Sequence, residues 1–309
     1  MTFKVLCTDG YGKAGIEELQ KTPGIEVTFE KALTPEELLA KIPAFDALIV
    51  RSASKVTRQV LDAGKNLKIV VRAGVGTDNI DKAAAAERGI EVANAPAGNT
   101  TSTAELAFAM MLAMARHIPQ ASAAMHEGRW EKKLFMGTEL AGQTLGIIGL
   151  GRVGCAVAKR AIAFEMNVMG YDPIAQADII EGLGVKPATP EEIFRNADFI
   201  TVHTPLTDDT RDMIDAKAFA MMKPNVRLIN CARGGIVNEE ALAAALKENR
   251  IAGAALDVYT KEPFDNPMFC CFGSCLLTPH LGASTKEAQD KVAVEAAQKV
   301  VEFFANLKK

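Results

Sequence analysis

The sequence has no excess of charge of either sign. Its 309 residues include 35 Lys and Arg against 38 Asp and Glu, which leaves a formal net charge of −3. Nonspecific nucleic-acid binding usually requires a clear surplus of positive charge. The near balance therefore argues against a nucleic-acid partner and favours a small-molecule ligand.

Long apolar runs are also missing. The longest, residues 106–115, has ten residues, roughly half of what a membrane-spanning helix needs. We expect this run to form a buried helix, and we expect no membrane partner. The first nine residues contain too short an apolar run for a signal peptide, so we also expect no export.

Cysteine occurs six times, without a paired framework and without a Cys-x-x-Cys motif. This usage favours the reducing cytosol, so we expect a cytoplasmic protein. Cys270, Cys271 and Cys275 lie close together in the sequence and raise the alternative of a zinc site. A fourth ligand at a suitable spacing is missing, and we therefore expect a solvated loop and no bound metal.

The chain does contain a regular alternation of apolar, strand-like runs with helical segments. The predicted strands are residues 4–7, 26–29, 47–50, 68–71, 145–148, 168–171, 199–203, 226–231, 254–258 and 276–277. Near-continuous apolar strands are typical of parallel sheets with helices on both faces. Because the length favours two domains, the sequence predicts an α/β protein with two doubly wound parallel sheets.

Capping side chains mark the predicted helix starts. Thr34, Thr189, Asn238 and Thr285 each precede early acids or a helix-compatible Pro. A long helix is predicted over residues 102–117, opened by Ser102, and a final helix after residue 285 could pack on either domain. The apolar stripe of that final helix comprises Ala288, Val292, Ala296, Val300 and Phe304.

The pattern GxGxxG occurs twice, at residues 10–15 and 149–154, and each copy follows a predicted strand. In a dinucleotide site the first Gly makes a tight turn and the second lets the backbone approach the pyrophosphate. The third allows close helix packing. The pattern alone is weak, so the choice between the copies depends on their context.

The second copy has the better context. The strand that follows it ends at Asp172, 18 positions after Gly154, where an acid binds ribose hydroxyls and repels a 2′-phosphate. We therefore predict NAD rather than NADP as cofactor. The first copy follows Asp9, whose charge would oppose a pyrophosphate, although Glu30 could mimic the ribose acid. A cofactor site at the first copy and a simple glycine-rich turn there both stay open.

Five segments, in this order, resemble the D-2-hydroxyacid dehydrogenases. They are VRAGVGTDNID at 71–81, GLGRVG at 149–154, NCARGG at 230–235, ALDV at 255–258 and TPHLGAS at 278–284. Within the family, segments 49–56, 130–137 and 279–289 most resemble the branch that oxidises 3-phosphoglycerate. Many relatives continue into a regulatory module that binds serine. This chain stops at Lys309, so feedback inhibition through such a module is not expected.

The resemblance implies two Rossmann-like domains with an active-site cleft between them. An NAD-binding domain, residues 98–283, is expected to be inserted into a substrate-binding domain formed by 1–97 and 284–309, and a homodimer is expected to form largely through the NAD-binding domains. The glycine motif and the resemblance together predict cofactor contacts at Gly149, Gly151, Arg152, Val153, Gly154, Asp172, Thr204, Cys231, Ala232, Asp257, Gly282 and Ala283.

Oxidising a hydroxyl group requires a side chain that takes up a proton near neutral pH, and histidine fits this role best. His280 follows a strand end, where α/β sheets bind ligands. The resemblance implies that His280 is the acid–base group, Glu262 its carboxylate partner and Arg233 the residue that holds the substrate carboxylate. Without the resemblance, the alternative is that His280 is a structural histidine, Glu262 a solvated acid in a loop and Arg233 a surface arginine.

A phosphorylated substrate needs further cations, since desolvating a phosphate without them is prohibitive. Arg51 and Arg72 follow or end strands of the first domain and are the candidates. Neutral donors would come from Ser52 and from the backbone of Val75 and Gly76. By resemblance, Lys132 reaches the substrate of the partner subunit, with a solvated surface charge as the alternative.

These residues predict NAD-dependent oxidation of 3-phosphoglycerate to 3-phosphohydroxypyruvate, the first step of serine biosynthesis. A glyoxylate/hydroxypyruvate or D-lactate dehydrogenase on the same scaffold is the enzymatic alternative. An NAD-sensing transcriptional corepressor, which shares the fold and the catalytic residues, is the alternative from another class. The loop 264–274 matches no pattern that assigns it a role.

Overall fold

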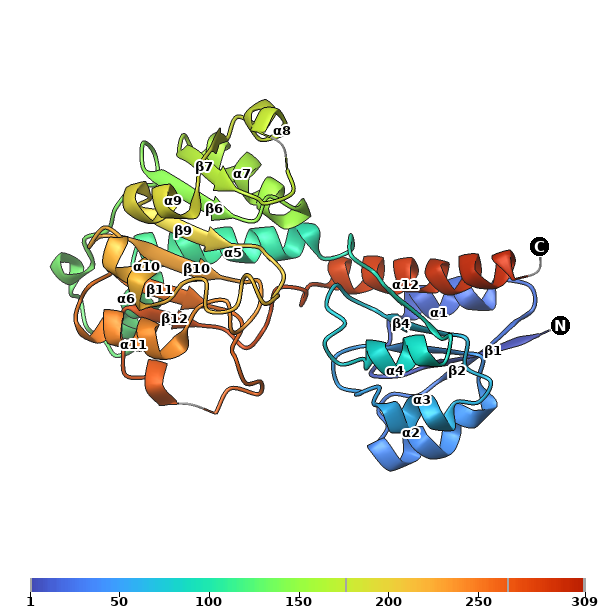
Figure 1. Cartoon of the computed structure of the whole chain (residues 1–309). Helices are drawn as coiled ribbons and strands as arrows, with labels where there is room; N and C mark the ends of the chain where they lie inside the picture. The colour runs from blue at the N-terminus through green and yellow to red at the C-terminus, as the bar shows by residue number, and fades with distance from the viewer. Residues whose placement is uncertain (1, 176, 266, 308–309) are drawn as a thin grey trace. The chain divides into compact units, whose positions relative to one another are not determined.

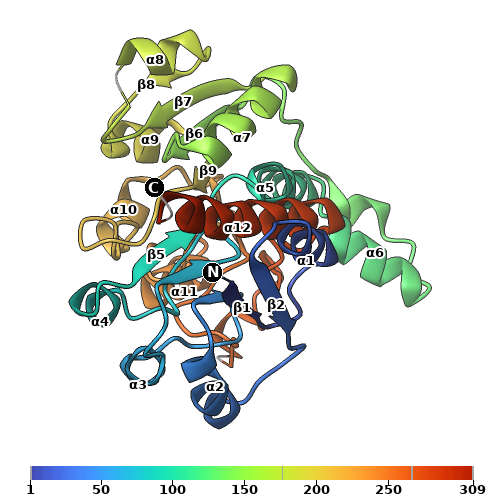
Figure 2. The same ribbon diagram turned by 90° about the vertical axis from the view of Figure 1, so that its right-hand side faces the viewer.

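The computed structural model describes residues 2–175, 177–265 and 267–307. The chain divides into two compact units, Met1–Thr100 with Ala283–Lys309, and Thr101–Gly282 (Figures 1 and 2). Both units contain a wholly parallel sheet with helices on its faces, so the predicted α/β class is confirmed. The unit boundaries lie close to the expected domain boundaries.

The first unit has a five-stranded parallel sheet in the order β2-β1-β3-β4-β5. The strands are β1 (Phe3–Cys7), β2 (Ile25–Phe29), β3 (Ala47–Val50), β4 (Ile69–Arg72) and β5 (Glu91–Asn94). The helices are α1 (Lys13–Gln20), α2 (Pro35–Lys41), η1 (Ile42–Ala44), α3 (Arg58–Ala63), α4 (Lys82–Glu87) and α12 (Lys286–Asn306). Figure 1 shows α1 and α12 on one side of this sheet and α2 and α3 on the other.

Both faces of this sheet are buried because alternate strand residues enter two separate apolar clusters. In β3, Ala47 and Ile49 belong to the cluster with α12, while Leu48 and Val50 belong to the cluster with α2, α3 and α4. Helix α12 packs within this unit, and every member of its predicted stripe is buried. Burial on both faces explains the near-continuous apolar strands.

The second unit has a seven-stranded parallel sheet in the order β12-β11-β10-β9-β6-β7-β8. Its strands are β6 (Thr144–Ile148), β7 (Asn167–Tyr171), β8 (Lys186–Pro187), β9 (Phe199–Val202), β10 (Arg227–Asn230), β11 (Gly253–Leu256) and β12 (Cys275–Leu277). Its helices are α5 (Thr100–Ala115), α6 (Ile118–His126), η2 (Lys132–Phe135), α7 (Arg152–Ala163), α8 (Ala177–Gly182), α9 (Pro190–Asn196), α10 (Ala216–Met221), α11 (Glu239–Lys247) and η3 (Pro267–Phe269). The strand order reverses direction between β6 and β9, which is where sheets of this type bind ligands.

Helix starts are mostly as predicted. Thr34, Thr189, Asn238 and Thr285 each accept a hydrogen bond from a backbone N–H in the first turn of the following helix. The predicted start at Ser102 is wrong, because α5 begins at Thr100. Ser102 lies buried within the first turn of that helix and does not precede it.

The helix predicted to reach residue 117 ends at Ala115. His117 then adopts a left-handed backbone conformation, with φ +52°, and α6 begins at Ile118. The apolar run 106–115 does form a largely buried helix, as predicted. None of the helices in the described ranges is both long enough and apolar enough to cross a membrane.

Candidate active site

The three glycines of the second GxGxxG copy have three different surroundings. Gly149 turns the chain after β6 with φ +95°, which favours glycine. A Cβ at Gly154 would overlap the carbonyl oxygen of Gly149, so this position packs α7 against the turn. A Cβ at Gly151 would have no described atom within 4 Å, so the backbone there is open to a ligand.

Asp172 follows β7 and binds the tip of this glycine turn. Its Oδ2 atom accepts a hydrogen bond from the backbone N–H of Leu150 at 2.8 Å. Nearby, at the end of β9, the Thr204 hydroxyl is buried and has no hydrogen-bond partner among the described residues. The open turn, the ribose acid and the unpaired hydroxyl together fit a dinucleotide.

The first GxGxxG copy is closed by the chain itself. A Cβ at Gly12 would lie 2.9 Å from the Cβ of Ala293, so α12 covers this turn. The carboxylate of Asp9 accepts hydrogen bonds from the Arg51 N–H (2.8 Å), the Ser54 N–H (3.0 Å) and the Ser54 hydroxyl (2.6 Å). These contacts favour the second copy as the cofactor site and a glycine-rich packing turn for the first.

The other predicted cofactor residues lie mainly at the carboxyl ends of neighbouring strands in the same sheet. Arg152 and Val153 open α7 after β6, Thr204 follows β9, Cys231 and Ala232 follow β10, Asp257 follows β11, and Gly282 and Ala283 come after β12. Cys231 is nearly buried, and its thiol lies 3.5 Å from the Met110 sulfur in α5. Burial raises the pKa of this thiol, so it stays neutral.

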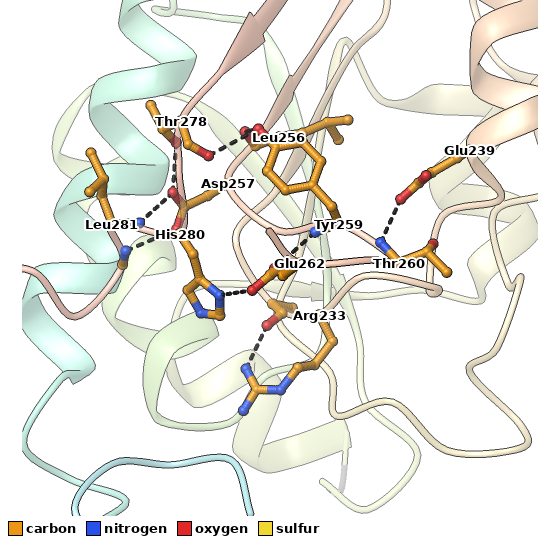
Figure 3. Close-up of polar contacts among 12 residues, drawn as sticks. Arg233, Glu239, Leu256, Asp257, Tyr259, Thr260, Glu262, Thr278, His280 and Leu281 are labelled. Carbon is orange, nitrogen blue, oxygen red and sulfur yellow. Dashed lines mark hydrogen bonds and ion pairs between the residues drawn. The ribbon is translucent and has the colours of Figure 1, made fainter. Parts of the chain in front are cut away.

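Two of the three predicted catalytic residues form a direct pair (Figure 3). His280, in the segment after β12, donates from Nδ1 to Oε2 of Glu262 at 2.7 Å. Because a carboxylate only accepts, Nδ1 carries the proton and Nε2 is left to face a substrate. The two side chains are 49% and 34% exposed, so solvent or a ligand can reach them.

Glu262 is held as a carboxylate. Partial burial raises its pKa, but the hydrogen bonds from His280 and from the Tyr259 N–H, together with the charges of His280 and Arg233, outweigh this and lower the pKa below its usual value. The Tyr259 N–H donates to Oε1 at 3.0 Å. An ionised Glu262 in this position accepts the Nδ1–H of His280 and holds the orientation of the ring.

Arg233 lies beside this pair because the loops after β10 and β11 touch. A Cβ at Gly234 would overlap the carbonyl group of Tyr259, so only glycine permits this backbone contact. Asn230 shapes the loop, donating from Nδ2 to the Arg233 carbonyl (2.9 Å) and accepting from the Ala232 N–H (3.0 Å). The structure thus gathers a guanidinium, a carboxylate and an imidazole at one edge of one sheet (Figure 3).

Asp257 supports the turn that carries His280. It is fully buried, and its carboxylate accepts hydrogen bonds from the Thr278 hydroxyl (2.6 Å), the Leu281 N–H (2.7 Å) and the Gly282 N–H (2.9 Å). These bonds enclose His280, whose backbone is left-handed with φ +55°. Asp257 therefore stabilises the turn that carries His280. A direct contact between Asp257 and the cofactor stays a prediction.

The predicted phosphate cations lie together in the first unit. Val50 pairs with Arg72 in the sheet register, so Arg51 and Arg72 both lie at the carboxyl ends of the adjacent strands β3 and β4. Asn79 fixes the loop after β3 by donating to the carbonyls of Arg51 (2.8 Å) and Ser54 (2.7 Å). Ser52 and Val75 are exposed and Gly76 is partly exposed, so these three neutral sites are accessible.

Lys132 lies in the second unit, exposed in η2. Its neighbours Trp130, Leu134 and Met136 are 80%, 70% and 81% exposed. A contact between Lys132 and a substrate stays a prediction. No group of three or more His, Cys, Asp or Glu is arranged to hold a metal within the described ranges, and Cys270 and Cys271 are exposed thiols.

Comparison with known proteins gives a consistent result. Residues 108–282 match the family model described as "D-isomer specific 2-hydroxyacid dehydrogenase, NAD binding domain". The chain is 48% identical to D-3-phosphoglycerate dehydrogenase of Archaeoglobus fulgidus, covering 99% of this chain and 58% of the relative, and 45% identical to the Synechocystis enzyme of the same name, covering 98% and 54%.

The chain thus spans little more than half the length of these curated relatives. Among solved structures, a Thermus thermophilus protein superimposes with a TM-score of 0.87 at 33% identity, covering 96% of both chains. The resemblance read from the five sequence motifs is confirmed: the chain belongs to the D-isomer specific 2-hydroxyacid dehydrogenase family, and its second unit contains the family's NAD-binding domain.

Proposed function

We propose that this protein is an NAD-dependent dehydrogenase that oxidises 3-phosphoglycerate to 3-phosphohydroxypyruvate, the first step of serine biosynthesis. The observation that carries the chemistry is the 2.7 Å bond between His280 Nδ1 and Glu262 Oε2 beside Arg233, at the edge of the NAD-binding sheet. The substrate is supported by relatives named D-3-phosphoglycerate dehydrogenase at 45–48% identity.

Each of the three side chains has one task in this reaction. The guanidinium of Arg233 holds the substrate carboxylate with a planar pair of donors. The neutral Nε2 atom of His280 accepts the hydroxyl proton as the C2–H bond breaks, and Glu262 stabilises the imidazolium that results. Bound NAD⁺ supplies the acceptor for the hydride. In the reverse direction protonated His280 donates to the ketone oxygen.

Arg51 and Arg72 are the proposed cations for the phosphate group. Their positions at the ends of paired strands keep two guanidinium groups at one edge of the first sheet. Guanidinium groups bind phosphate through charge-assisted hydrogen bonds with fixed geometry. The corresponding unphosphorylated acids would offer these cations no phosphate oxygens to bind.

A homodimer is the proposed assembly. The exposed apolar residues Trp130, Leu134 and Met136 lie in or next to the η2 segment and would be covered by a second copy of this chain. In that arrangement Lys132 would be supplied to the partner's substrate. The proposed location is the cytoplasm, which suits six cysteines without a disulfide framework.

A substrate panel tests the function directly. With NAD⁺, kcat/KM for 3-phosphoglycerate is expected to exceed that for D-lactate and D-glycerate by about 100-fold or more, because only the phosphate engages both arginines. Initial rates of NADH formation measure this. Equal or higher activity with an unphosphorylated acid would favour the glyoxylate/hydroxypyruvate or D-lactate alternative, and binding of NAD without turnover would favour the corepressor.

Glu262→Gln is expected to move the pH optimum for keto-acid reduction downward. Reduction requires a protonated imidazole, and the ionised carboxylate favours that form, so the neutral amide retains it only at lower pH. The pH dependence of kcat for reduction provides the measurement. Glu239→Gln is the matched control, since Glu239 binds the Thr260 N–H in the same loop without touching the imidazole. An unchanged profile in Glu262→Gln would remove this residue from the mechanism.

A further inference from the structure

Tyr259 lies in the loop after β11 that also carries Glu262, and its side chain reaches the segment after β12 that carries His280 (Figure 3). Its phenol hydroxyl donates to the carbonyl oxygen of Thr278 at 2.9 Å and approaches the Leu256 carbonyl oxygen at 3.2 Å. The same Thr278 oxygen accepts the backbone N–H of His280 at 3.1 Å. The hydroxyl therefore fixes the turn from which the imidazole projects.

The main chain of Tyr259 contacts the other partner. Its N–H donates to Oε1 of Glu262, while Oε2 of the same carboxylate accepts from His280 Nδ1. One residue thus binds the carboxylate through its backbone and the histidine turn through its side chain. The spacing between the two catalytic groups depends on both bonds.

Tyr259 is itself held firmly. The residue is 7% exposed, and its ring stacks on Phe264 at 4.3 Å between centroids. The Gly234 backbone packs directly on the Tyr259 carbonyl group. Burial raises the pKa of the phenol to about 12. The hydroxyl consequently stays a donor throughout the neutral pH range.

We propose that Tyr259 is a positioning residue for the acid–base pair, which sets the distance from His280 to Glu262 by clamping the loops after β11 and β12 to each other. This proposal rests on the proposed function of His280 and Glu262. Both catalytic side chains are partly exposed and lie on loops, so packing around them alone does not fix their geometry. Catalytic groups must be held closely in place, and a hydrogen bond from a rigid, buried ring does this.

Tyr259→Phe tests the clamp because it removes only the hydroxyl and retains the ring and the backbone N–H. We expect kcat for keto-acid reduction to fall about three- to tenfold, the range that the loss of one hydrogen bond allows, with the KM for NADH unchanged. We also expect the downfield NMR resonance of the His280 Nδ1 proton to exchange with solvent about three- to tenfold faster in the substrate-free protein. The His280→Ala variant assigns this resonance.

Tyr11→Phe is the matched control. Tyr11 also donates its buried hydroxyl to a backbone carbonyl, that of Ala293, but it does so in the first unit. This variant is expected to leave kcat and the His280 resonance unchanged. If Tyr259→Phe loses NADH binding through misfolding, Phe264→Leu weakens the stacking and leaves the hydroxyl in place, and it should change the same two quantities in the same direction by a smaller factor.

The outcomes separate this proposal from the proposed function. An unchanged kcat and unchanged proton exchange in Tyr259→Phe would overturn the clamp and leave the acid–base role of His280 standing. An equal loss of kcat in Tyr11→Phe would also overturn it, because the effect would then be general destabilisation. Faster proton exchange in Tyr259→Phe, in a protein whose wild type reduces no 2-keto acid, would support the clamp and reject the dehydrogenase function.

Discussion

His280→Ala is expected to lower kcat by about two to four decades while NADH binding is retained, in line with the usual contribution of general acid–base catalysis. The imidazole is the group that takes up and returns the substrate proton, and alanine cannot do either. NADH binding should survive because most of the predicted cofactor residues lie directly after β6, β7 and β9 or in the first turn of α7, and not in the segment after β12 that carries His280. Steady-state kinetics and a fluorescence titration with NADH measure the two quantities.

His126→Ala is the control for the loss of a histidine. His126 is exposed at the end of α6, where it bonds the carbonyl of Ser122 at 2.8 Å. This variant should keep wild-type turnover. If His280→Ala also lost NADH binding, its low activity would reflect collapse of the histidine turn and would no longer support a role in proton transfer.

Arg51→Ala is expected to reduce kcat/KM for 3-phosphoglycerate by about 100-fold or more and to change reduction of hydroxypyruvate little. Without Arg51 one negative charge of the bound phosphate loses its partner, whereas hydroxypyruvate has only a neutral hydroxyl group at that position. The loop should keep its shape, because the Arg51 backbone N–H, which the substitution retains, donates to the Asp9 carboxylate at 2.8 Å, and the side chain adds only a long bond of 3.5 Å from Nη1 to the Asp9 carbonyl. Parallel assays with both substrates give the ratio.

Arg58→Ala is the matched control in the same unit, since Arg58 forms a surface ion pair with Glu87 at 2.6 Å. Both substrates should be used by this variant as by the wild type. An equal loss on both substrates in Arg51→Ala would mean that the arginine acts on the common part of the ligand. If Arg51→Ala lost activity on neither substrate, Arg51 would not be the cation that binds the phosphate.

Most strands can be predicted from the sequence because burial on both faces makes them continuously apolar. The two strands that the apolar pattern does not predict lack this signal. β5 has four residues, of which the two at its ends, Glu91 and Asn94, are polar, and β8 has only two residues, Lys186 and Pro187. The predicted helix also runs to His117, two residues past the end of α5 at Ala115, because the left-handed backbone of His117 has no signature in the sequence.

The candidate site can be predicted only as far as short motifs reach. Arg233, Glu262 and His280 each lie in a recognisable segment. The residues that hold their loops in place, however, make hydrogen bonds to partners far away in the sequence. Asp257 binds Gly282, 25 positions away, and Tyr259 binds Thr278, 19 positions away. These contacts exist because β11 and β12 pair in parallel, and no local pattern specifies them.

The Asp9 carboxylate has a consequence for binding stoichiometry. It is held beside the first glycine turn by the N–H groups of Arg51 and Ser54, and its negative charge would repel a diphosphate placed there, while α12 covers the turn at Gly12. The first sheet therefore has no vacancy for a second nucleotide, although its strand–turn–helix pattern matches the other copy. One molecule of NAD per polypeptide is the occupancy that this arrangement permits, and the strand ends around Arg51 are left to a ligand of another kind.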